Sequence, residues 1–363
     1  MSARGIALET RVTVLELSQP LRISRATMSR REAVWVALRV AGEVGYGELL
    51  GSRYLGVRVP EAIGTLRRQV APALARQPTP EAALTALRAD RLLPAEVSAP
   101  VRAAVEAALL DLWGRSLGQP VHRLLGTEVR PSAPTARTVG MVRPKEAAAQ
   151  ARWLVARGFR LLKVKAGSPD PEEDLARIGA VLTSAPGARV LVDANGAWTV
   201  ARAASLLPRL AELGVEAVEQ PTVPGVPEEL ARLAERSPLP LIADEDAAGL
   251  AEVRRLAGRV QGVNVKLAQC GGVYRALEIT AALAGSGTRL MLGCQAGSSL
   301  SIAPAVHLVD RARWVDLDGH LLLAHDPWRG VGGADGTVGA GTGPGLGVRP
   351  AAGQAEGGQR AHA

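Results

Sequence analysis

Apolar and polar residues alternate in three short stretches near the start of the chain, and turn residues separate them. The stretches are 11–17, 32–40 and 44–50, and their two-residue period predicts a three-stranded antiparallel meander. Residues 19–31 are too many for a tight turn, so we expect a loop there that carries binding residues. Helical spacing follows in 59–75, 80–92 and 101–117, which completes an α+β domain.

Beyond residue 127 the chain repeats an apolar segment followed by a helical pattern, as in 171–182 and 200–213. The apolar segments end 22 to 28 residues apart, at Thr138, Lys163 with Lys165, Asp193, Glu219, Asp244, Lys266, Cys294 and Asp316. This period is typical of a parallel β/α barrel, in which the carboxyl ends of the strands converge on one mouth. An open doubly wound sheet has a similar period, but it would spread these residues along an edge.

The predicted fold class is therefore α/β, with a (β/α)7β-type TIM barrel over residues 127–325 and an α+β capping domain over residues 1–126. Glycine is dense after Asp326, and we expect residues 326–351 to form turns around one or two short strands that return to the capping domain. Residues 352–363 are expected to be a disordered tail.

The composition limits the cellular compartments and the kinds of partner that we expect for this protein. The 363 residues are 47% hydrophobic and 21% charged, which is typical of a globular protein. No apolar run approaches the roughly 18 residues of a membrane span, and the start lacks a signal-peptide core, so we expect a cytoplasmic protein with no membrane partner. With only Cys270 and Cys294, a disulfide framework and a cysteine-built zinc site are excluded. The net charge of +8 is spread over scattered arginines with acidic residues between them, so no nucleic-acid partner is expected.

Lysine is rare in this chain. Of 43 basic residues only four are lysines, namely Lys145, Lys163, Lys165 and Lys266. Lys163 and Lys165 share one face of a strand, because side chains two residues apart point the same way. Arginine cannot release its proton in a protein, whereas a lysine with a lowered pKa can. We interpret the three strand-end lysines as groups that must shed a proton; the alternative is that they only cap strands electrostatically.

Three carboxylates, Asp193, Glu219 and Asp244, end three consecutive predicted strands. A lone acid at such a place usually caps the next helix. Three like charges at one mouth repel, and a hard divalent cation relieves that repulsion, so we expect Mg²⁺. Asn195, Gln220 and Glu245 follow these strand ends and are expected to orient the ligands or to pair with a lysine.

The lysines flank the carboxylates, with Lys163 and Lys165 on an earlier strand and Lys266 on a later one. Two amines on opposite sides of one carbon can remove a proton from one face and return it to the other, which is what a racemase or epimerase needs. The obstacle is the charge of the enediolate that forms, and a cation in a dry pocket stabilises it. Neighbouring positive charge is expected to lower the pKa of the base.

The segments KVK, VDANGAW, VEQP, ADE and NVKL, in this order, resemble the muconate-lactonizing-enzyme subgroup of the enolase superfamily, over nearly the whole chain. The resemblance implies that Asp193, Glu219 and Asp244 bind Mg²⁺ and that Lys165 and Lys266 are the two acid/base catalysts. It also implies that Lys163 holds and polarises the substrate carboxylate.

The eighth strand, WVDLDGH, places Asp316 and Asp318 on one face, and such a pair suggests an ammonium ligand. It resembles the Asp-x-Asp signature of the dipeptide epimerases, which implies a grip on the α-amino group, with Thr138 and the backbone around Cys294 also contacting substrate. PLRISRA in the predicted loop resembles the lid of L-Ala-D/L-Glu epimerases. That implies an arginine for the glutamate side chain, with Arg25 the better match and Arg22 the weaker one.

The leading hypothesis is a Mg²⁺-dependent dipeptide epimerase that inverts the α-carbon of the C-terminal residue, acting on L-Ala-L/D-Glu from cell-wall peptide recycling. Its partner would be the small dipeptide, and we expect a homo-oligomer. The alternatives are a cycloisomerase or lyase of the muconate cycloisomerase or o-succinylbenzoate synthase type, an N-acylamino-acid racemase, or a non-catalytic basic protein. One departure stands out: many family members carry Glu on the seventh strand, where this chain has CQAGSS.

Overall fold

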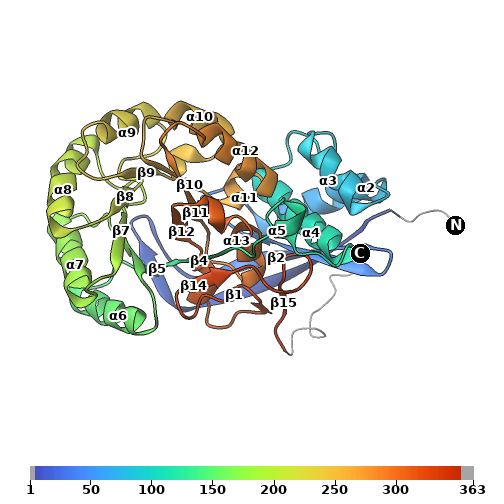
Figure 1. Cartoon of the computed structure of the whole chain (residues 1–363), viewed down its shortest axis with the longest axis horizontal. Helices are drawn as coiled ribbons and strands as arrows, with labels where there is room; N and C mark the ends of the chain where they lie inside the picture. Colours follow the sequence, from blue (N-terminus) through green and yellow to red (C-terminus); the bar gives the residue numbers. More distant parts are fainter. Residues whose placement is uncertain (1–4, 353–363) are drawn as a thin grey trace.

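The computed structural model describes residues 5–352, and its centre is a barrel of eight parallel strands (Figure 1). The strands are hydrogen-bonded in chain order, and β12 comes round beside β5, where Leu317 N donates to Thr135 Oγ1 at 2.9 Å. Their bounds are β5 Ala136–Val139, β6 Leu161–Lys165, β7 Arg189–Asp193, β8 Ala217–Glu219, β9 Leu241–Ala243, β10 Gly262–Val265, β11 Arg289–Gly293 and β12 Trp314–Asp316. The predicted (β/α)7β barrel class is confirmed.

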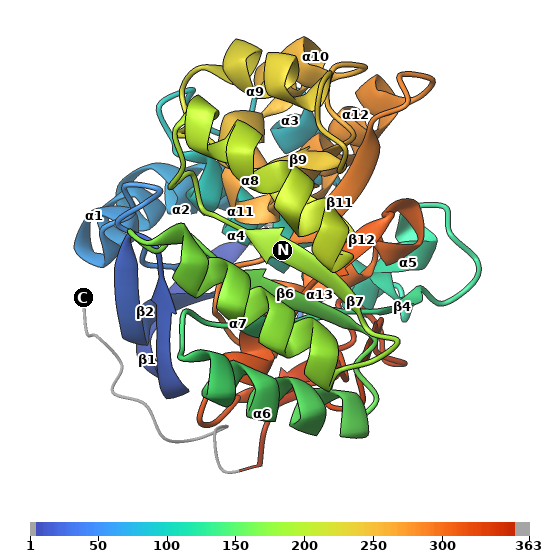
Figure 2. The same cartoon turned by 90° about the vertical axis from the view of Figure 1, so that its left-hand side faces the viewer.

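Helices join successive strands and cover the outside of the barrel; Figure 2 shows α6, α7 and α8 on that face. They are α6 Pro144–Ala156, α7 Pro171–Ser184, α8 Val200–Leu213, α9 Pro227–Ala234, α10 Leu250–Leu256, α11 Leu267–Cys270, α12 Val273–Leu283 and α13 Ser299–Val306. Within residues 5–352 none of the helices has both the length and the apolar character that crossing a bilayer requires.

The barrel interior is filled in layers, because alternate residues of each strand point inward. The lowest layer is buried and apolar: Ala136, Leu161, Leu191, Ala217, Ile242, Met291 and Trp314. On β10 the inward residue is Gly262, where a Cβ atom would lie 2.8 Å from the Trp314 ring, so the indole fills that space. Two residues further along each strand, the same inward positions hold Thr138, Lys163, Asp193, Glu219, Asp244, Asn264, Gly293 and Asp316. A dry apolar floor therefore lies directly beneath the polar residues.

The capping domain begins with the predicted meander, β1 Ala7–Ile23, β2 Ala26–Val40 and β3 Glu43–Leu50. The prediction of a loop at 19–31 is wrong. Strands β1 and β2 continue as a hairpin up to the pair Ile23 and Ala26, and only Ser24 and Arg25 form the turn. A register shift between Glu16 and Leu21 lets the ladder resume beyond an irregular stretch. Arg25 is thus carried on the tip of a long hairpin.

Helical segments follow the meander: α1 Val59–Thr65, η1 Leu66–Val70, α2 Ala71–Ala75, α3 Pro80–Arg88, α4 Ala99–Ser116 and α5 Val121–Leu124. The glycine-rich C-terminal segment contributes β13 Trp328–Arg329, β14 Thr337–Gly339 and β15 Arg349–Pro350; β14 pairs with β4 Ser132–Pro134. It also packs on the capping domain, since the Trp328 ring lies 5.5 Å from that of Trp35 and Leu346 N donates to Asp111 Oδ1 at 2.8 Å. The domain limits remain predictions, and residues 353–363 of the expected disordered tail lie outside the described residues.

Candidate active site

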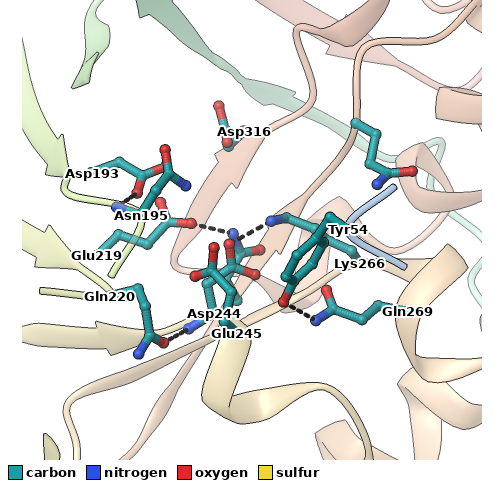
Figure 3. Close-up of polar contacts among 12 residues, drawn as sticks. Tyr54, Asp193, Asn195, Glu219, Gln220, Asp244, Glu245, Lys266, Gln269 and Asp316 are labelled. Atoms are coloured by element: carbon teal, nitrogen blue, oxygen red, sulfur yellow. Dashed lines mark hydrogen bonds and ion pairs between the residues drawn. The ribbon is translucent and has the colours of Figure 1, made fainter. Parts of the chain in front are cut away.

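Three carboxylates from adjacent strands converge at the carboxyl end of the barrel (Figure 3). Asp193 ends β7 directly opposite Glu219, which ends β8, and Asp244 follows the last residue of β9. All three are buried, with relative exposures of 1%, 0% and 0%. The structure therefore brings together the three residues proposed as metal ligands.

The strand-end lysines bracket this row of carboxylates. Lys165, on the β6 side, has its Nζ 2.5 Å from Asp193 Oδ2, and Lys266, on the β10 side, pairs with Asp244. Lys163 lies deeper, with Nζ 2.8 Å from Glu219 Oε2, 3.1 Å from Asp193 Oδ2 and 2.6 Å from Asp316 Oδ2. The two proposed acid/base lysines thus approach one group of carboxylates from opposite ends.

Burial and mutual charge perturb these groups strongly. Burial raises the pKa of Glu219, and its neighbour Asp193 raises it further, against the opposing effect of Lys163. For Asp193, burial also acts upward, but the ammonium groups of Lys165 and Lys163 outweigh it and hold the pKa below its usual value. Perturbed acids in contact with bases at a barrel mouth are typical of a catalytic site.

The sequence predicted a lowered pKa for the catalytic base, but the surrounding side chains raise the pKa of Lys266. Burial lowers its pKa, but the carboxylates of Asp244 and Glu219 outweigh burial, so the net shift is upward. Positive charge placed among the same carboxylates would act in the opposite direction.

The donor set fits a hard divalent cation. In the described part of the chain no three His, Cys, Asp or Glu side chains form a complete metal cage, because the lysine ammonium groups lie between the carboxylates. Yet Asp244 Oδ1 is buried without a hydrogen-bond donor. Buried carboxylate oxygens without donors are costly unless a cation or a polar ligand reaches them. These residues could hold Mg²⁺ once the ammonium groups give way.

Polar neighbours fix the carboxylates, as expected for Asn195 and Gln220. Asn195 N donates to Asp193 Oδ1 at 2.9 Å, and Asn195 Oδ1 accepts from Lys165 Nζ at 3.2 Å. Gln220 Oε1 accepts from Asp244 N at 3.0 Å. Both Asn195 and Gln220 have a left-handed backbone, with φ of 46° and 35°, a strained conformation that is common at functional sites.

The two acids of the eighth strand lie in different surroundings. Asp316 pairs with Lys163 and keeps Oδ1 buried without a donor. Asp318 lies just past β12, and its Oδ2 accepts from Arg137 Nη1 at 3.1 Å and from Thr138 N at 2.7 Å. Arg137 carried no signal in the sequence, because it points away from the inward face that Thr138 shares with the other polar residues.

Cys294 follows β11 close to these acids. Burial raises its thiol pKa well above the ordinary value, and the charges of Asp316 and Asp318 raise it further. The thiol therefore stays protonated.

Arg25 reaches the mouth from the hairpin tip. Its Nη1 lies 2.6 Å from Glu245 Oε1, and its guanidinium stacks 4.5 Å from the centre of the Tyr54 ring. Burial raises the pKa of Tyr54 to about 12, and the charges of Glu245 and Asp244 add to the rise. Arg22 lies near β5, where its carbonyl accepts from Met141 N at 2.9 Å. The structure thus places Arg25, with Tyr54, over the site and already pairs it with an acid.

Asn264 and Gly293 are site residues that the sequence reasoning missed. Asn264 Nδ2 donates to Glu219 Oε1 at 2.7 Å, and a Cβ atom at Gly293 would lie 2.3 Å from Asn264 Oδ1. A signal was available, since Asn264 precedes Lys266 by two residues and so shares its inward face. The need for glycine on β11 is visible only in three dimensions.

This fold and site define the class of the protein. Residues 146–354 match the enolase C-terminal domain-like family, and residues 7–126 match the mandelate racemase / muconate lactonizing enzyme N-terminal domain. The chain belongs to the enolase superfamily, in its mandelate racemase and muconate lactonizing enzyme division, so the resemblance read from the sequence is confirmed.

Individual relatives narrow the comparison. The chain is 33% identical to a hydrophobic dipeptide epimerase of Roseobacter litoralis, over 89% of this chain and 93% of that protein. It is 31% identical to the L-Ala-D/L-Glu epimerase of Bacteroides thetaiotaomicron (95% and 89% covered) and 31% identical to muconate cycloisomerase 1 of Rhodococcus opacus (94% and 95% covered). Among solved structures, a dipeptide epimerase from Enterococcus faecalis V583, in complex with Mg and L-Leu-L-Tyr, superposes with a TM-score of 0.88 at 27% identity, over 95% of this chain and 99% of that one.

Proposed function

We propose that this protein is a Mg²⁺-dependent dipeptide epimerase that inverts the α-carbon of the C-terminal residue. The observation that carries the proposal is the placing of Lys165 and Lys266 at the two ends of the buried row Asp193, Glu219 and Asp244. The named relatives that epimerise dipeptides, with nearly the whole chain covered, support the same reading.

In this mechanism one lysine takes the α-proton from one face of the substrate and the other lysine delivers a proton to the opposite face. The accepting lysine must be a neutral amine and the donating one an ammonium, so the two exchange roles with the direction of reaction. Mg²⁺ held by Asp193, Glu219 and Asp244 would supply positive charge against the substrate carboxylate as the α-carbon loses its proton. Lys163, 3% exposed, would add positive charge near the same carboxylate.

Substrate amine recognition is assigned to Asp316 before Asp318. Asp316 Oδ1 is buried without a donor, which suits an ammonium group. Asp318 already accepts from Arg137 and from Thr138 N, so Thr138 contributes through its amide by holding this acid in place. Cys294 would form the adjacent wall.

The C-terminal side chain of the substrate would lie under the hairpin tip, where Arg25 could bind the carboxylate of L-Ala-L/D-Glu. A specific observation also favours a second candidate, a dipeptide with an apolar side chain. The Arg25 charge is already met by Glu245 at 2.6 Å, and its flat face rests on Tyr54. A dipeptide panel decides between the two.

Deuterium wash-in tests the function. In D₂O with Mg²⁺, the wild-type protein should exchange the α-proton of the C-terminal residue of L-Ala-L-Glu or of another dipeptide and form both epimers, read by mass spectrometry and NMR. Lys165→Arg and Lys266→Arg keep the charge but cannot accept a proton, so each should abolish inversion. Lys145→Arg, at an exposed lysine of α6, is the matched control and should behave as wild type. Absence of exchange with every dipeptide would end the proposal.

A lyase or cycloisomerase of the same superfamily acts on a carboxylate without an amine. Asp316→Asn separates the two classes, since it should weaken dipeptide binding and leave a lyase substrate unaffected. The cytoplasmic location and the homo-oligomeric state expected from the sequence remain predictions; light scattering after gel filtration tests the latter.

A further inference from the structure

Two buried carboxylates of the capping domain cap helices of the barrel. Glu48, on β3, accepts from Ser298 N at 2.9 Å and from Ser298 Oγ, immediately before α13. Glu106, on α4, accepts from Val273 N and from Tyr274 N, in the first turn of α12. The first amide groups of a helix have no acceptor within the helix, so a carboxyl oxygen placed there satisfies them. The capping domain is therefore fastened to the helices that follow the sixth and seventh barrel strands.

The Glu106 contact is closely fitted. The residue is 3% exposed, and burial raises its pKa to about 8 while the two amide groups oppose that rise. Gly272, just before α12, has φ of 123°, and a Cβ atom there would lie 2.1 Å from Glu106 Oε2. Only glycine lets the carboxylate come this near, so residue type and backbone conformation at position 272 both serve the contact.

A short chain of bonds leads from Glu106 to Lys266. The Lys266 carbonyl accepts from Gln269 N at 2.8 Å and from Cys270 N at 3.0 Å, which closes the single turn α11. Gly272 N then donates to the Leu267 carbonyl at 2.9 Å. The segment from Lys266 to α12 is thus a compact unit, and α4 packs against α11 and α12 (Figure 1).

We propose that Glu106 is a positioning residue for Lys266: by holding the first turn of α12 on the capping domain, it fixes the segment that aims this lysine at the substrate. The inference rests on the proposed epimerase function and deepens it, because it makes one of the two bases dependent on the capping domain. Lys165 has a different support. It lies on β6 between two neighbouring strands, and its carbonyl accepts from Arg177 Nε at 3.2 Å.

This difference predicts an asymmetric defect in Glu106→Leu. For the epimer whose proton Lys165 removes, abstraction still occurs, but return through Lys266 is slowed. That epimer should therefore gain deuterium without inverting, and the ratio of wash-in to inversion rises. The opposite epimer, which needs Lys266 for abstraction, should lose exchange and inversion together. A misplacement of about 1 Å can cost about 10²-fold, so we expect changes of about tenfold to 10²-fold.

The measurement follows both epimers of one dipeptide, L-Ala-L-Glu and L-Ala-D-Glu or the pair that the wild type turns over fastest, in D₂O with Mg²⁺. The ratio does not depend on how much of the protein is folded, so a merely structural loss leaves it unchanged. Glu106→Gln keeps one acceptor oxygen and should give a smaller asymmetry; if Glu106→Leu does not fold, this variant carries the test. Glu48→Gln, at the matching cap of α13, is the control and should slow both epimers equally.

An unchanged ratio for both epimers in both Glu106 variants, or an equal change for both, would overturn the inference while leaving the epimerase function standing. A wild-type protein that exchanges no dipeptide refutes the function, and the inference falls with it.

Discussion

Lys163→Met removes a cation that contacts three buried carboxylates. In the wild type its Nζ lies within 3.1 Å of oxygens of Asp193, Glu219 and Asp316, and its side chain is 3% exposed. Removing one partner of a buried ion pair typically costs about 3–5 kcal/mol, because the remaining charge is neither solvated nor paired. Since about 1 kcal/mol shifts the Tm of a domain of this size by roughly 2–4 °C, the expected loss is on the order of 10 °C.

The loss should depend on the metal. Methionine keeps much of the volume, so the cavity term is small, and the main deficit is positive charge. A divalent ion among the same carboxylates supplies that charge, and at a concentration of about 100 times Kd binding adds about 2.7 kcal/mol. We expect the Tm of Lys163→Met to fall far below wild type in EDTA and to recover more than wild type when Mg²⁺ is added. Calorimetry at constant ionic strength measures both.

Lys145→Met is the matched control, since Lys145 is exposed on α6, and its Tm should equal that of wild type with and without Mg²⁺. If Lys163→Met loses the same Tm in EDTA and in Mg²⁺, the carboxylates do not share an ion. If it loses no Tm at all, the charge argument is wrong.

Three further predictions concern the surroundings of the site. Gly293→Ala places a Cβ atom 2.3 Å from Asn264 Oδ1, so the Asn264 amide should move away from the Glu219 carboxylate. The Mg²⁺ affinity, measured by calorimetric titration, should then fall about 10- to 100-fold, and an unchanged affinity would show that the amide is dispensable. Burial lowers the pKa of His307 to about 4, so between pH 6.5 and 4 the unfolded chain binds a proton at this histidine and the folded chain does not. The free energy of unfolding should therefore fall by about 3 kcal/mol over that range, and His307→Gln should remove this part of the pH dependence. Arg25→Met should raise the KM for L-Ala-L-Glu about 10- to 100-fold and change an apolar dipeptide little, if the guanidinium leaves Glu245 for substrate; equal effects on both would assign it a structural role.

Much of the barrel could be predicted because its strands obey a strict two-residue period. The inward position of each strand is apolar at the floor, and the next inward position is polar, as in Leu161 followed by Lys163 or Leu191 followed by Asp193. A repeat of 22 to 28 residues then places these positions around one mouth. Chain order alone thus predicted which residues are neighbours, although not how far apart their atoms lie.

The capping domain was less predictable, because its contacts join positions far apart in the chain. Residues 19–31 were predicted as a loop because they are too many for a tight turn between two strands, whereas the ladder resumes there after a shift in register. Arg137 and Tyr54 carry no periodic signal, and each interacts with an acid about 180 to 190 residues away in the sequence. Nothing in the helical pattern distinguishes Glu106 from its neighbours; its role is visible only from its close approach to Gly272.

These long-range contacts determine which part of the capping domain can move when a substrate binds. The carboxylates of Glu48 and Glu106 fasten the capping domain to the barrel at two helix starts, and breaking either contact would remove donors from a buried acid. A rigid-body opening of the whole domain is therefore costly. The hairpin tip is fastened differently: Arg25 is half-exposed and holds Glu245 through one ion pair at 2.6 Å, which costs far less to break. Substrate-dependent movement should thus be confined to the tip, and substitutions there should alter side-chain preference while the wash-in to inversion ratio, which reports on the two lysines, stays constant.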